Sequence, residues 1–118
     1  MKTTAIIAEQ IYNDGVYATE FDFEAGFDAL VACRNPEFVY RAGRFWKTFD
    51  CEAGLDSLIA AESPRFVYYA GHEWPEFNFK KGQAYLSRAG SPEFLFYAGA
   101  HWKTFDFDAG IAALINIK

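Results

Sequence analysis

Residues 35–62 read NPEFVYRAGRFWKTFDCEAGLDSLIAAE, and the chain returns to this pattern every 28 residues. The residues that recur in three consecutive units are Pro36, Pro64 and Pro92; Gly43, Gly71 and Gly99; Trp46, Trp74 and Trp102; and Phe49, Phe77 and Phe105. A further glycine recurs at Gly26, Gly54, Gly82 and Gly110, while Gly15, Phe21 and Ala18, the last in place of tryptophan, extend the register toward the N-terminus. Repeats of this length are typical of solenoids.

Each unit is predicted to form two short helices. Asn35 offers an N-cap acceptor, and Pro36 suits the first helical position, where its missing N–H costs nothing. Apolar residues follow helical spacing from Val39 to Trp46, which predicts a first helix of about eleven residues. Asp50 is the expected N-cap of the second helix, because a carboxylate complements the helix dipole there. In the next two units, Ser63 and Ser91 stand at the position of Asn35 and are the expected N-caps of the first helices there.

Two glycines in each unit fall inside the expected helices, where glycine costs roughly 1 kcal/mol relative to alanine. One interpretation is that Gly43 is a C-cap, which leaves a first helix of seven residues. The other is that Ala42–Gly43 and Ala53–Gly54 are places where paired helices cross closely. We favour the second interpretation, because a continuous helix to Trp46 keeps the apolar face in phase.

These observations predict an all-α fold, a right-handed α-solenoid of four 28-residue helix-turn-helix repeats with about eight short helices. We expect a single repeat domain over residues 1–118, with repeats at about 7–34, 35–62, 63–90 and 91–118. The design is similar in logic to tetratricopeptide, Sel1-like and HEAT repeats, whose units are longer. The segments Pro36–Ala42, Pro64–Ala70 and Pro92–Ala98 also resemble short helical repeats of bacteriophage and bacterial proteins. This resemblance transfers no catalytic residue.

Composition narrows the class of protein. The net charge of −5 and pI near 4.9 argue against nucleic acid as a partner, since phosphate binding needs a basic field. Cys33 and Cys51 lack metal-ligand spacing and are expected to be free, buried thiols in a reducing compartment. No stretch of about 18 apolar residues is present, so we expect no membrane association and a cytoplasmic location.

Positions that vary within the repeat frame are the best candidates for partner binding. One varying column holds Arg44, His72 and Ala100, the next holds Phe45, Glu73 and His101, and a third holds Lys47, Pro75 and Lys103. The third unit also replaces an acidic helix start by two lysines. The candidates are therefore Arg41, Arg44, Lys47, His72, Glu73, Lys80, Lys81, His101 and Lys103. The first helices carry most cations and the second helices most acids, which predicts surfaces of opposite charge or, alternatively, ordinary solvated faces.

The three tryptophans allow two interpretations. Together with Tyr40, Tyr68 and Tyr97, a row of Trp46, Trp74 and Trp102 could hold a peptide, a sugar or unstacked bases. The tryptophans fall on the same helix face as the alanine–glycine pairs, and this position would instead place them between helices. We favour a core position on this periodicity.

Catalysis finds no support in the sequence. His72 and His101 fall in different columns of the repeat, without metal-ligand spacing. His72 and Glu73 are neighbours in sequence, so on a helix their side chains should point in different directions. We therefore expect no catalytic residue, no bound metal and no cofactor.

The last helix is as apolar as an internal one, although repeat arrays usually finish with a polar cap. Its apolar residues are Ile111, Leu114, Ile115 and Ile117. These residues could pair with a second copy to form a two-fold homodimer, or dock on another protein. The alternative is that Ile111 and Leu114 face the preceding unit and nothing stays exposed.

Three classes of function follow. The leading hypothesis is a non-enzymatic protein–protein interaction scaffold, encoded by a phage or mobile element, that binds and inhibits a host protein such as a defence nuclease, as an anti-CRISPR protein does. The alternative is an aromatic-lined module for a ligand, a peptide or single-stranded nucleic acid. The third is a purely structural or engineered repeat protein, which Cys51 disfavours because other units hold phenylalanine at that position.

Overall fold

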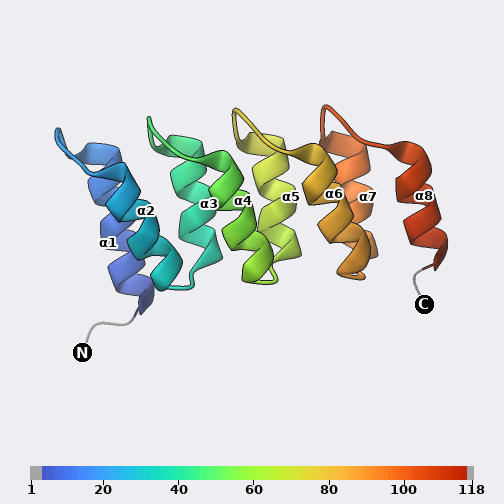
Figure 1. Cartoon of the computed structure of the whole chain (residues 1–118), viewed down its shortest axis with the longest axis horizontal. Coiled ribbons are helices and arrows are strands. Elements are labelled where there is room, and N and C mark those ends of the chain that lie inside the picture. Colours follow the sequence, from blue (N-terminus) through green and yellow to red (C-terminus); the bar gives the residue numbers. More distant parts are fainter. Residues whose placement is uncertain (1–3, 117–118) are drawn as a thin grey trace.

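The computed structural model describes residues 4–116, which form eight helices and no strand. The helices are α1 (Thr4–Tyr17), α2 (Phe23–Ala32), α3 (Pro36–Phe45), α4 (Cys51–Ala60), α5 (Pro64–Glu73), α6 (Phe79–Arg88), α7 (Pro92–His101) and α8 (Phe107–Asn116). They stack as a row of hairpins, with α1 and α8 at opposite ends (Figure 1). The predicted helical solenoid is confirmed, while its right-handed sense stays a prediction.

The hairpins build two layers. The odd-numbered helices pack against one another in sequence, α1 on α3, α3 on α5 and α5 on α7, and the even-numbered helices lie in front of them in Figure 1. The molecule measures 47 × 30 × 17 Å, so it is long and flat. None of the helices in residues 4–116 has the length and apolar character needed to cross a membrane.

Local sequence signals explain where the helices begin. The side chain of Asp50 accepts a hydrogen bond from the backbone N–H of Ala53 at 3.0 Å, as expected of an N-cap. Pro36 occupies the first turn of α3, also as expected. The prediction for Asn35 is wrong in one respect, because this residue precedes the helix but its side chain makes no capping hydrogen bond. The same correction applies to Ser63 and Ser91.

The first helix of a unit runs through its glycine. α3 ends at Phe45 with ten residues, and Trp46 follows as an extended C-cap whose N–H donates to the carbonyl of Ala42. The interpretation of Gly43 as a C-cap is therefore wrong. Trp46, Trp74 and Trp102 are 5–6% exposed, which confirms the core position of all three indoles.

The glycines make room for these indoles. A Cβ atom at Gly43 would overlap the ring of Trp74, and a Cβ atom at Gly54 would lie 2.5 Å from Phe49 and 2.9 Å from Trp74. The nearest neighbours of both glycines are thus aromatic side chains rather than a crossing helix backbone, which corrects the prediction of close helix crossing. The indole N–H of Trp74 also donates to the carbonyl of Tyr40 at 2.9 Å.

We call this arrangement an indole slot: two glycines and a phenylalanine of one unit, plus one helix carbonyl, that receive the tryptophan of the next unit. Equivalent slots in other units hold Trp46 and Trp102, whose indole N–H groups donate to the carbonyls of Tyr12 and Tyr68, respectively, at 3.0 Å. The three filled slots are Gly15, Phe21, Gly26 and Tyr12; Gly43, Phe49, Gly54 and Tyr40; and Gly71, Phe77, Gly82 and Tyr68.

The turns between units need a left-handed residue at the same repeat position. Arg34, Glu62 and Gly90 have φ values of 55°, 53° and 67°. Of these three residues, only Gly90 adopts this conformation without a Cβ penalty.

Cys33 and Cys51 are both free, as expected, but they are half-buried rather than buried.

The indole slots generate a stability prediction with an internal control. Gly71→Ala should lower the free energy of unfolding by about 1–3 kcal/mol, because the added methyl group overlaps the buried ring of Trp102. Gly99→Ala makes the same change on α7, where the added Cβ would meet Phe105 at 3.2 Å instead of overlapping an indole, and alanine is the better helix former by roughly 1 kcal/mol. Urea unfolding should therefore separate the two variants, and equal stabilities would contradict the slot interpretation.

Candidate interaction surface

Aromatic side chains from the odd-numbered helices meet on one face of the solenoid. Tyr40 of α3 contacts Phe66 and Tyr69 of α5, with ring centroids 5.7 and 5.8 Å apart. Tyr68 of α5 in turn contacts Tyr97 of α7 at 5.8 Å. We call the set the aromatic surface; its members are Tyr40, Phe66, Tyr68, Tyr69, Phe94 and Tyr97, and all are at least partly exposed.

Polar groups lie beside these rings. The Tyr68 hydroxyl is hydrogen-bonded to Nδ1 of His101 at 2.7 Å, and the His101 ring lies 5.9 Å from the ring of His72. Nδ1 of His72 lies 2.9 Å from Oε1 of Glu73, whose other carboxylate oxygen is 3.6 Å from Nε of Arg44. The expectation that His72 and Glu73 point apart is wrong, because Glu73 is the last residue of α5 and its side chain folds back.

Burial affects the phenols of this surface. It raises the pKa of Tyr40 above 10.0, although the nearby Arg44 acts in the opposite direction. Burial also raises the pKa of Tyr68, and the neighbouring phenols Tyr69 and Tyr97 add to the effect. Both hydroxyls therefore keep their protons at neutral pH, so the phenols of Tyr40 and Tyr68 are uncharged hydrogen-bonding groups.

Four of the nine candidate residues, Arg44, His72, Glu73 and His101, thus lie together beside the aromatic surface. Arg41 forms an ion pair with Glu37 on its own helix at 2.5 Å and lines a hollow between α3 and α5 together with Tyr40 and His72. Lys47 and Lys103 follow α3 and α7, and their ammonium groups lie 5.9 and 5.8 Å from the rings of Phe23 and Phe79 in the preceding unit. These two lysines therefore pack between units, away from the aromatic surface.

The two lysines of the third unit lie on the even-numbered helices. Nζ of Lys81 lies 3.0 Å from a carboxylate oxygen of Glu52 and also contacts Asp56, both on α4. Hydrogen bonds from Lys81 and then Asn78 lower the pKa of Glu52, and hydrogen bonds to Asp56 and then Glu52 raise the pKa of Lys81. Lys81 thus links two units instead of forming a free basic patch, while Lys80 stays exposed.

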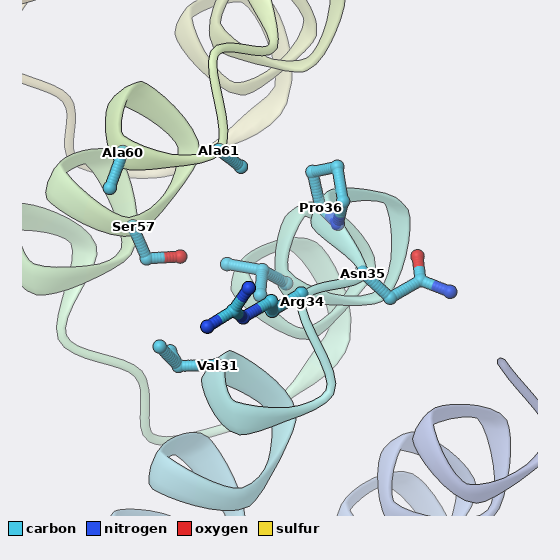
Figure 2. A pocket seen from close by; sticks show the side chains of 8 residues that line it. Val31, Arg34, Asn35, Pro36, Ser57, Ala60 and Ala61 are labelled. Atoms are coloured by element: carbon cyan, nitrogen blue, oxygen red, sulfur yellow. The ribbon is translucent and has the colours of Figure 1, made fainter. Parts of the chain in front are cut away.

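Shallow hollows accompany these features. One of about 470 Å³ lies between α3 and α5 and is lined by Tyr40, Tyr69 and His72 among others, and one of about 260 Å³ lies between α5 and α7. A further pocket of about 510 Å³ lies at the turn between α2 and α3 and the end of α4. Figure 2 shows that Arg34 extends between Val31 and Ser57 while Asn35 points away, so this pocket presents a single charged group.

No group of three or more histidine, cysteine or acidic side chains in residues 4–116 is arranged to hold a metal ion.

On α8, Ile111 and Ile115 are 57% and 75% exposed, and Leu114 is half-buried. The interpretation that leaves nothing exposed there is therefore wrong. Ile117 lies outside the described residues, and the homodimer stays a prediction.

Sequence reasoning placed Tyr40, Tyr68 and Tyr97 in an aromatic row but joined them to the wrong partners, the buried tryptophans. It missed Phe66, Tyr69 and Phe94. A signal for Phe66 and Phe94 was present in the sequence, since Phe38, Phe66 and Phe94 recur at the repeat period.

Comparisons with family models, with curated proteins and with solved structures find no match to this chain.

The ion pair across α4 and α6 can be tested by titration. Lys81→Met should raise the pKa of Glu52, because its principal hydrogen-bonding partner is lost. Since the native pKa is depressed, the interaction stabilises the fold above the unfolded-state pKa and is lost as the pH falls through the folded-state value. Side-chain carboxyl NMR of wild type and variant measures the change; Lys80→Met is the matched control and should leave Glu52 unaffected.

Proposed function

We propose that this chain is a non-enzymatic protein-binding scaffold that contacts its partner through the aromatic surface. The observation that carries the proposal is the unbroken contact of partly exposed rings across α3, α5 and α7, from Tyr40 to Tyr97. Tyrosine, phenylalanine and arginine are among the residues enriched in protein interfaces, because each buries a large area, and tyrosine and arginine also form hydrogen bonds there.

The polar neighbours of these rings support the same proposal. Arg44, Glu73 and the two histidines sit beside the aromatic surface and vary between units, whereas the indole slots repeat. A constant frame with variable surface positions is how repeat proteins change partners without changing fold. The partner class that the sequence hypothesis names, a host protein inhibited by a phage or mobile-element product, belongs to this proposal.

The alternative of an aromatic-lined ligand site loses half of its support. The tryptophans on which it relied are buried and their N–H groups are already hydrogen-bonded within the solenoid. The tyrosines remain accessible, but the net charge of −5 provides no basic field for a nucleic-acid strand.

Affinity capture with matched tyrosine variants tests the proposal. The double variant Tyr69→Ala and Tyr97→Ala should recover a specific protein partner at least about tenfold less well than wild type, since each substitution removes a partly exposed ring of the interface. Quantitative mass spectrometry of the captured proteins is the measurement.

Tyr17→Ala is the control, because this tyrosine is 80% exposed on α1, outside the aromatic surface. It should recover the partner as well as wild type. Equal recovery by all three proteins, or recovery of nucleic acid without a protein, would contradict the proposal. Circular dichroism of each variant establishes that the helices are retained.

A further inference from the structure

The indole slot occurs four times in residues 4–116, and tryptophans of these residues fill three of the four copies. In each filled copy the ring lies against two glycines and a phenylalanine of the preceding unit, and its N–H donates to a helix carbonyl 34 residues earlier in the sequence. The centroid distance from the phenylalanine to the indole is 5.1–5.2 Å in all three copies. The slot is therefore a site with constant geometry and a constant occupant.

The fourth copy lies between α7 and α8, and no indole of the described residues lies against its glycines. Its glycines are Gly99 and Gly110, and its phenylalanine is Phe105. Phe107 stands where Phe23 and Phe79 flank the indoles of two filled slots, and the Phe105–Phe107 centroid distance of 5.3 Å is close to the 5.1 Å of the corresponding pairs. We call this copy the open slot.

The open slot is a real hollow rather than a collapsed remnant. A pocket of about 370 Å³ is lined by both glycines, both phenylalanines and Ile111, almost entirely with apolar surface. Phe107 is 61% exposed and Ile111 is 57% exposed, so large apolar side chains border it without being covered. By repeat position, the carbonyl that would accept an indole N–H is that of Phe96, which follows Tyr12, Tyr40 and Tyr68 in the series.

We propose that the open slot binds a tryptophan side chain presented by a partner polypeptide. The ring would lie against Gly99 and Gly110, with its edge toward Phe105 and its N–H directed to the carbonyl of Phe96. The ligand is identified by the three filled slots, which use the same groups to hold an indole and nothing else. This site is separate from the aromatic surface, so the proposal stands independently of the function proposed above.

A second copy of the chain does not supply this tryptophan. All three tryptophans are buried in slots of their own chain. The α1–α2 unit, which would continue the stack if copies joined end to end, carries Ala18 at the tryptophan position. Stacking of copies would therefore leave the open slot without its indole, which is why the proposed occupant is a partner of different sequence.

A peptide with the sequence of residues 63–77 and 5-fluorotryptophan at its single tryptophan position is a suitable probe, because it copies a segment that fills a slot in this chain. Fluorine NMR follows the peptide signal without interference from the protein's own indoles. Titration with the full chain should shift this signal saturably, and amide NMR should show the largest changes at Gly99 and Gly110.

Protein variants place the binding site. Gly99→Ala and Gly99→Leu put side-chain atoms where the indole would lie, and each should weaken binding at least about tenfold. Gly99→Ala favours the helix but brings a Cβ to 3.2 Å from Phe105, so circular dichroism of both variants must show that the helices are retained. Ala84→Leu, at an exposed position on α6 outside the open slot, should bind like wild type. A peptide with alanine in place of the fluorotryptophan, followed by the same amide signals, should not bind.

Three outcomes would overturn the proposal. The first is the absence of any fluorine shift up to millimolar peptide. The second is binding that the Gly99 variants leave unchanged, since the peptide then occupies another site. The third is a homodimer in light scattering whose formation Gly99→Leu abolishes, because a second copy would then cover the open slot.

Discussion

The structure depends on one contact, the seating of each indole in the glycine-lined slot of the preceding unit. The ring of Trp74 occupies space that a Cβ at Gly43 would need, and its N–H reaches the carbonyl of Tyr40 at 2.9 Å. This contact buries a large apolar group and satisfies its only polar atom at the same time. Because it always joins one unit to the next, stability should accumulate along the solenoid through neighbouring pairs of units.

Much of the fold could be predicted from the sequence because its signals are local or periodic. Pro36 and Asp50 mark helix starts by chemistry that acts within one turn, and the phase of Trp46 places it between helices. The reason for the glycines could not be found in this way. A repeat period shows that Gly43 and Trp74 are fixed in phase, but it does not show that they touch. The left-handed turns at Arg34 and Glu62 could not be predicted from the sequence either, since neither residue type favours that conformation.

The candidate surface was predicted only in part, for a related physical reason. Arg44, His72, Glu73 and His101 vary between units, and the solenoid brings them together because equivalent positions on α3, α5 and α7 lie side by side. Variation alone did not separate them from Lys81, which pairs with Glu52 and Asp56 of the unit before it. A charge that differs between units can belong to the joint between them as well as to a free surface. Only the distances distinguish the two.

The indole slot also gives the two ends of the array different chemistry. Each inner unit presents a tryptophan to the unit before it and a slot to the unit after it, which is a heterologous contact that can in principle continue without limit. Ala18 removes the tryptophan from the first unit, whereas Gly99, Phe105 and Gly110 keep the slot in the last. If copies were stacked end to end, Ala18 would therefore not supply the tryptophan contact that joins neighbouring units. The slot that remains can still receive an indole from a polypeptide with a tryptophan to offer.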